Sequence, residues 1–139
     1  MLVLLDSNIF LSALISPHGA PHTIYVRWID KEFRVLTCMQ QIDEIRRASR
    51  YPHLREKLQP HLVGTMLNHL YASTLWPEPI PRKHDAADPN DSYLLDLIEA
   101  AQPDFAVTGD KRSGLLQRRK LGRTRILTAA SFCATVLKS

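Results

Sequence analysis

Four consecutive apolar residues, Leu2 to Leu5, stand almost at the start of the chain and end at the acidic residue Asp6. A strand that lacks alternating polar positions has to be covered on both faces, as strands are in parallel α/β sheets. Asp6 therefore marks the carboxyl end of a buried strand, which is the edge where open α/β sheets bind ligands. A simpler interpretation is also open, because Asp6, Ser7 and Asn8 are residue types that turn a chain or cap a helix.

Helical and strand-like patterns alternate along the rest of the chain. Apolar residues recur at helical spacing in the segments 21–31, 40–50, 62–71 and 88–101. Apolar runs typical of strands occupy 33–38, 104–110 and 124–129, and further helices are expected at 113–120 and 131–138. The proline-rich segment 76–84 suits neither a regular helix nor a central strand and is a connection. This order predicts a parallel sheet with helices on both faces.

The composition is typical of one soluble domain. With 139 residues, of which 45% are hydrophobic, the chain can form a single domain over residues 1–139 with a substantial core. No apolar segment approaches the roughly 20 residues that cross a bilayer. The N-terminus lacks the pattern of a signal peptide, so we expect a cytoplasmic protein, with Cys38 and Cys133 as free thiols. The net charge of +4 favours anionic partners such as nucleic acid or an acidic protein.

Acidic residues also occur where other predicted elements begin or end. Asp110 follows an apolar run, and in a parallel sheet that strand ends at the same edge as the strand before Asp6. Asp88 and Asp91 stand at the start of a predicted helix, where Asp88 suits the N-cap and Asp91 complements the helix dipole. Glu44 lies near the start of helix 40–50, either as a dipole partner or as a residue that faces a cleft. Capping and dipole effects alone could explain the last three acids.

Acidic side chains gathered at one sheet edge would repel one another unless a cation neutralises them. Ligands that offer only oxygen atoms favour Mg²⁺ or Mn²⁺ over zinc. A divalent cation bound in this way activates water and stabilises the charge on a phosphodiester, which is the chemistry of metal-assisted nucleases. The sequence contains no zinc motif, no GxGxxG and no phosphate-binding loop, so the main competing enzyme classes lack their defining feature.

Four motifs in this order, LLDSNIFLSAL, QQIDEIRR, DPNDSYLLDLIEA and FAVTGDK, resemble those of the PIN-domain ribonucleases. The chain is similar in particular to the small stand-alone bacterial group that forms the toxin components of toxin–antitoxin pairs. The resemblance extends over essentially the whole chain. It implies a three-layer α/β/α sandwich around a five-stranded parallel sheet, single-stranded RNA as the substrate, and an acidic antitoxin as a partner.

The resemblance also implies a role for each matching residue. The implied catalytic residues, which would hold one or two Mg²⁺ or Mn²⁺ ions, are Asp6, Glu44, Asp91 and Asp110, with Asp88 as an accessory metal ligand. Asn8 would position the first aspartate or a water molecule. Ser7 and Thr108 would form hydrogen bonds at the rim of the pocket.

The region after Asp110 departs from the family pattern. Members of this group often carry another acid shortly after this aspartate, whereas Arg112 and Ser113 stand there in this chain, which puts an auxiliary metal or water contact in doubt. The basic residues of this region could bind RNA phosphates: Lys111, Arg112, Arg118 and Arg119. A solvated helix face explains the same charges equally well.

Other functions and assemblies are also open. A receiver-like signalling domain gathers acids and Mg²⁺ at a similar edge, but it requires adjacent acids after the first strand and regular βα repeats, which this chain lacks. A catalytically inactive PIN-like module that binds RNA or a partner is a second alternative. We also expect a homodimer, a higher oligomer or burial against an antitoxin helix, because so small a chain would not bury every large apolar residue, among them Trp28, Leu62, Met66 and Leu70.

Overall fold

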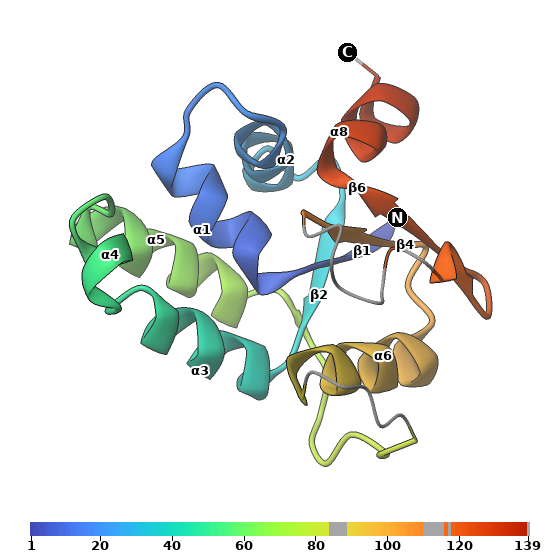
Figure 1. Ribbon diagram of the computed structural model, residues 1–139. Coiled ribbons are helices and arrows are strands. Elements are labelled where there is room, and N and C mark those ends of the chain that lie inside the picture. Colours follow the sequence, from blue (N-terminus) through green and yellow to red (C-terminus); the bar gives the residue numbers. More distant parts are fainter. Residues whose placement is uncertain (84–88, 110–115, 117, 139) are drawn as a thin grey trace.

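The computed structural model describes residues 1–83, 89–109, 116 and 118–138, and of residues 89–91 it describes the backbone alone. Half of the helix predicted at 113–120 therefore lies outside the described residues. Helices lie on both sides of a central sheet (Figure 1). Within the described ranges, no helix is both long and apolar enough to cross a membrane.

The sheet contains six strands within the described residues, in the order β3-β2-β1-β4-β6-β5. Near its centre, β1 (Leu2–Leu5) pairs in parallel with β2 (Arg34–Thr37) on one side and β4 (Phe105–Thr108) on the other. The parallel sheet is extended by β3 (Thr74–Leu75) and β6 (Thr124–Thr128), while β5 (Lys120–Leu121) pairs antiparallel with β6.

Both faces of β1 are buried, as its uninterrupted apolar run predicts. Val3, Leu4 and Leu5 are each at most 2% exposed. Val3 and Leu5 belong to one hydrophobic core, and Leu4 belongs to a second core on the opposite face. A strand of this kind has to be covered by helices on both sides, which fixes the layered architecture.

Helices from several parts of the chain cover the first core. They are α1 (Ser7–Ile15), α2 (Ala20–Ile29), α3 (Met39–Ala48), α5 (Pro60–Tyr71) and α8 (Ala129–Phe132). The short α4 (Pro52–Arg55) lies between α3 and α5 in the chain. On the opposite side of the sheet, α6 (Pro89–Ala101) covers the second core (Figure 1). The predicted apolar faces are confirmed, since Ile42 and Ile45 of α3 and Ile98 of α6 are all 0% exposed.

The three-layer α/β/α sandwich is confirmed, and the details of its second half differ from the prediction. The described residues form six strands instead of five, and β5 is antiparallel because Gly122, at φ +59°, permits a tight hairpin between β5 and β6. The helix predicted at 131–138 is divided into α8 and a π-helical segment, η1 (Cys133–Leu137).

Three of the four large apolar residues expected at an oligomer interface are buried within a single chain. Trp28 is 8% exposed, and Met66 and Leu70 are 0% exposed, whereas Leu62 is partly exposed. An oligomer stays a prediction, but the three buried side chains do not supply its interface.

The two cysteines are free, as predicted. Cys38 is 0% exposed at the start of α3, and Cys133 is half-buried. Cys38 belongs to the core, and this burial raises the pKa of its thiol. The thiol is therefore a poor nucleophile.

A buried amide ties α3 to the carboxyl ends of β1 and β2. The Gln41 side chain is 0% exposed; its Nε2 donates to the Leu5 carbonyl at 2.6 Å, and its Oε1 accepts from the Thr37 hydroxyl at 2.7 Å. Buried polar groups need such partners, because leaving one unpaired costs roughly 1–3 kcal/mol. These two bonds therefore hold the first turns of α3 against the sheet edge that carries Asp6.

Replacing Gln41 with Leu, which has a similar volume and no polar atoms, removes both hydrogen bonds. We expect the free energy of unfolding, measured by urea denaturation, to fall by about 1–3 kcal/mol. The matched control is Gln40→Leu, at the exposed neighbouring position, which should change it by no more than about 0.5 kcal/mol. Equal effects of the two substitutions would contradict this role of Gln41.

Candidate active site at the carboxyl edge of the sheet

Asp6 lies at the junction of β1 and α1, where it contacts both the helix and the neighbouring strand. Its Oδ1 accepts the backbone N–H of Asn8 at 3.5 Å, which makes Asp6 the N-cap of α1. Its Oδ2 accepts the hydroxyl of Thr108, the last residue of β4, at 3.1 Å. The capping interpretation is thus confirmed, and the same carboxylate also stands at the sheet edge.

The strand order explains why β1 and β4 meet at this point. From β1 the chain crosses to β2 and β3 on one side, and it then returns to β4 and β6 on the other side. Ligands of open α/β sheets bind in the crevice at such a reversal of strand order. The backbone N–H of Asp6 donates to the carbonyl of Val107 at 2.9 Å, so the parallel pairing continues up to the acid itself.

Glu44 joins this edge through a tyrosine from the opposite layer. Its half-buried carboxylate accepts the hydroxyl of Tyr93, on α6, at 3.2 Å. The Tyr93 oxygen also lies 3.4 Å from the hydroxyl of Ser7, at the start of α1. Because the phenolic proton is directed at Glu44, Ser7 donates in this second contact. The chain Ser7–Tyr93–Glu44 therefore links α1, α6 and α3.

The environment of Tyr93 keeps its hydroxyl a donor. Burial raises the pKa of this phenol strongly, and the negative charge of Glu44 raises it further. The side chain is 6% exposed and stays protonated at neutral pH. One oxygen of Glu44 is therefore held in place by a neutral donor.

Sequence reasoning missed Tyr93 and Gln41 as parts of this edge. Tyr93 follows Asp91 by two residues and is buried in α6 among four aliphatic residues and Asp96. A buried tyrosine usually has a hydrogen-bond partner, so its hydroxyl was a signal for a polar neighbour. The identity of that neighbour could not be predicted, because Glu44 lies far away in the sequence.

The predicted site residues are described to different extents. Asp6, Ser7, Thr108 and Glu44 are brought to one edge, whereas the exposed Asn8 takes part through its backbone N–H. Asp91 lies in the first turn of α6, and its side chain is not described. The residues outside the described ranges are Asp88, Asp110, Lys111 and Arg112. Of the predicted RNA-binding residues, Arg118 and Arg119 are exposed, and Arg119 lines a surface pocket together with Arg125.

The sequence was compared with the profiles of known protein families. The sequence profile of the PIN domain matches residues 2–112, which include β1, α3, α6 and β4. The chain belongs to the PIN-domain family. PIN domains are generally nucleases, and the matched range contains all the elements that form the edge described above. Neither the curated proteins nor the solved structures gave a significant match.

The donor atoms at this edge of the PIN domain fit a hard divalent cation. Asp6 and Glu44 both present carboxylate oxygens, which Mg²⁺ and Mn²⁺ prefer. Among the described residues no cation pairs with Glu44, whose partner is the neutral Tyr93 hydroxyl. Within the same residues, no group of three or more His, Cys, Asp or Glu is placed to hold a metal ion. A complete metal site thus requires acids beyond these two, and Asp91 and Asp110 are the predicted ones.

The raised pKa of Tyr93 predicts a loss of stability at alkaline pH. In the unfolded chain a tyrosine ionises near pH 10, whereas the folded protein keeps this phenol protonated to higher pH. The unfolded state therefore loses a proton first, and the free energy of unfolding falls above pH 10 by up to about 1.4 kcal/mol per pH unit.

Tyr93→Phe should remove this part of the pH dependence, as measured by urea denaturation between pH 8 and pH 11. Tyr51→Phe changes an exposed tyrosine and should keep the wild-type dependence. If Tyr93→Phe and the wild type lose stability in parallel above pH 10, the burial of the Tyr93 phenol beside Glu44 is wrong.

Proposed function

We propose that this PIN domain is a divalent-metal-dependent endoribonuclease that cleaves single-stranded RNA. The observation that carries the proposal is that Asp6 lies at the carboxyl edge of the sheet and that Ser7, the next residue, is linked through Tyr93 to Glu44. Thr108 and Tyr93 hold these carboxylates with neutral hydroxyl groups. The neutral Tyr93 hydroxyl orients the Glu44 carboxylate without cancelling its charge, which leaves that charge available to a cation.

The proposed metal ligands are Asp6, Glu44, Asp91 and Asp110, with Asp88 as an accessory ligand. Two observations support the acids whose side chains are not described. Asp91 lies in the first turn of α6, two residues before Tyr93, and Asp110 follows Thr108 by two residues. A bound Mg²⁺ or Mn²⁺ would activate water and stabilise negative charge on the phosphodiester.

The residues of the chain itself would position the reacting groups. Thr108 and the Asn8 N–H orient the two oxygens of Asp6. Tyr93 orients Glu44 and is oriented in turn by the buried Ser7. The predicted RNA contacts, Lys111, Arg112, Arg118 and Arg119, would hold phosphates after β4.

We further propose that the chain is the toxin of a toxin–antitoxin pair. This proposal rests on the resemblance to the small bacterial PIN proteins and on a net charge of +4 with a pI near 9.3, which suits an acidic partner. Production of the wild-type chain in a bacterial host should then arrest growth, and Asp6→Asn should not. Normal growth with both variants at equal protein levels would contradict the toxin role.

The alternative is a catalytically inactive PIN module that binds RNA or a partner without cutting. The two functions are separated by incubating the purified protein with labelled RNAs in Mg²⁺, Mn²⁺ or EDTA. Cleavage of single-stranded RNA that requires the metal supports the nuclease. Binding without cleavage in every condition supports the alternative.

Asp6→Asn tests the metal ligand against the helix cap. Asn caps a helix about as well as Asp, so metal-free stability should change by no more than about 0.5 kcal/mol, or rise because like charges are reduced. Cleavage should fall by at least about 100-fold, and the rise in melting temperature on adding Mg²⁺ or Mn²⁺ should shrink. Asp6 is only a cap if this variant keeps wild-type cleavage and wild-type metal response.

Glu44→Gln has a matched control one residue away. Gln keeps an oxygen that can accept from Tyr93, so folding should be preserved while metal-dependent cleavage is lost. Asp43→Asn removes an exposed acid on the same helix, whose carboxylate is 3.4 Å from Arg46, and should retain cleavage within about twofold. Equal activity of the two variants would remove Glu44 from the site.

A further inference from the structure

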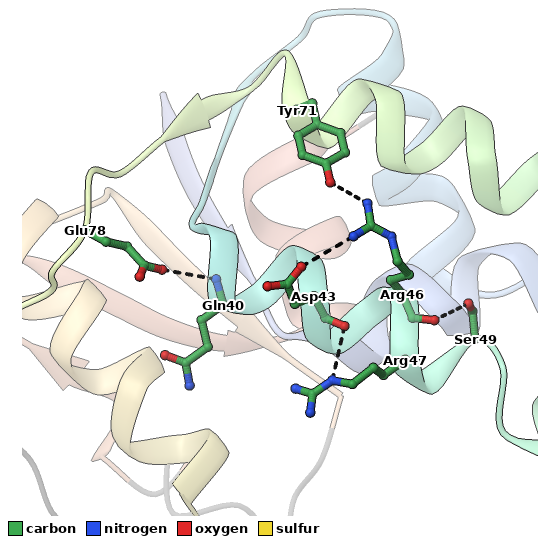
Figure 2. Close-up of polar contacts among 7 residues, drawn as sticks. All are labelled: Gln40, Asp43, Arg46, Arg47, Ser49, Tyr71 and Glu78. Atoms are coloured by element: carbon green, nitrogen blue, oxygen red, sulfur yellow. Dashed lines mark hydrogen bonds and ion pairs between the residues drawn. The ribbon is translucent and has the colours of Figure 1, made fainter.

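Three exposed arginines follow Glu44 along the chain: Arg47, Arg50 and Arg55. Within the described residues, no ion pair is formed by Arg47, Arg50 or Arg55. Their neighbour Arg46 differs, because its guanidinium contacts Asp43 at 3.4 Å and the hydroxyl of Tyr71 (Figure 2). Among the residues that the structure describes, the three surface arginines thus have no charged partner, whereas Arg46 is engaged within the protein.

The helical geometry of α3 places Arg47 close to the candidate site. Arg47 follows Glu44 by three residues, so the two share a helix face about one turn apart. Figure 2 shows Arg47 and Arg46 on different sides of α3, with Arg46 directed at Tyr71. The Arg47 Nε donates to the carbonyl of Asp43 at 3.4 Å, which leaves its remaining N–H groups at the surface.

The row continues past the end of α3. The backbone N–H of Arg50 donates to the carbonyl of Arg47 at 3.1 Å. The backbone N–H of Tyr51 donates to the carbonyl of Ala48, also at 3.1 Å. These bonds extend the helical turn, so Arg50 follows Arg47 by three residues on a neighbouring position of the surface. Glu44, Arg47 and Arg50 therefore follow one another at intervals of about one helical turn.

Tyr51 adds an exposed aromatic surface to this row. Its side chain is 52% exposed, and its ring stacks on His53 with centroids 6.2 Å apart and an interplanar angle of 23°. The Tyr51 carbonyl accepts from Leu54 and Arg55 at 2.9 and 2.8 Å, which fixes this residue at the start of α4. Tyr51 stands between Arg50 and Arg55 in the chain, and an exposed aromatic ring near basic side chains is a typical platform for an unpaired base.

We propose that Arg47, Arg50, Tyr51 and Arg55, here called the α3 strip, form the path by which single-stranded RNA extends away from the active site. The arginines bind successive phosphates, and the Tyr51 ring stacks on a base. This inference rests on the proposed function, and it adds a surface separate from the basic residues after β4.

A neighbouring groove offers an alternative partner. It has a volume of about 340 Å³, an apolar lining that includes Leu58, Val63 and Leu67, and arginines at its rim, which would suit an acidic peptide. Arg50 and Arg55 line that groove, whereas Arg47 and Tyr51 do not. A bound RNA strand would contact all four residues of the α3 strip, whereas a peptide in the groove would contact only Arg50 and Arg55. The observations therefore favour RNA.

The test measures RNA binding apart from cleavage. Asp6→Asn protein is titrated in EDTA against a fluorescent, unstructured RNA of about 12 nucleotides, a length within known single-strand site sizes, over a series of salt concentrations. Replacing Arg47, Arg50 and Arg55 together with Gln should reduce the slope of log K against log salt by about 2, because each phosphate contact contributes about 0.7. Tyr51→Ala should weaken binding about tenfold without a change of slope.

The matched control carries the same change of charge at the opposite end of the sheet and at the C-terminus. Lys31→Gln, Arg34→Gln and Lys138→Gln together alter exposed residues and should leave the salt slope unchanged. Urea denaturation should show that both triple variants are folded. Equal salt slopes for the two triple variants would overturn the proposal. It would also be overturned if the triple arginine variant lost binding to a fluorescent Glu-rich peptide but kept binding to RNA.

Failure of the strip and failure of the proposed function give different results. If the wild type cleaves RNA and the triple arginine variant has the same KM and salt slope, the strip is wrong and the nuclease stands. If the wild type cleaves no RNA in either metal, while the arginine variant loses RNA binding, the strip stands and the catalytic function is wrong.

Discussion

Burial of β1 on both faces is the constraint on which the rest of the molecule depends. Val3 and Leu5 require cover on one side of the sheet, and Leu4 requires it on the other. The chain meets both needs by placing α6 opposite the remaining helices, and so it has to cross to both sides of β1. That crossing reverses the strand order between β1 and β4, and the reversal brings Asp6 beside Thr108.

The carboxylates at the two edges of the sheet have different kinds of partner. At the amino edge, Asp104 accepts from the backbone N–H of Leu2 at 2.8 Å and pairs with Arg123 at 2.7 Å, which together hold its pKa below the usual range. At the carboxyl edge, Glu44 receives only the neutral hydroxyl of Tyr93 within the described residues. The first arrangement fastens strands together, whereas the second preserves a negative charge that a bound cation can use.

The parts of the fold that follow from local patterns could be predicted from the sequence. The run before Asp6 predicts a buried strand and its ligand-binding edge, and the spacing of Ile42 and Ile45 predicts the buried face of α3. The pairing of Tyr93 with Glu44 could not be predicted, because it depends on how α6 sits against α3 across the sheet edge. The side chains of Asp88, Asp91 and Asp110 are not described, so their place in the site stays a prediction.

The position of α3 couples the proposed catalytic and binding surfaces. Gln41 anchors this helix to the sheet, and the following turns present first Glu44 and then Arg47. Carboxylates at the edge repel RNA phosphates until a cation is bound, so an attractive charge is needed close by. Arg47 follows Glu44 by about 4.5 Å along the helix axis, well within the screening length of about 8 Å in physiological salt. The helix can therefore hold a phosphate beside the acidic edge before the metal completes the site.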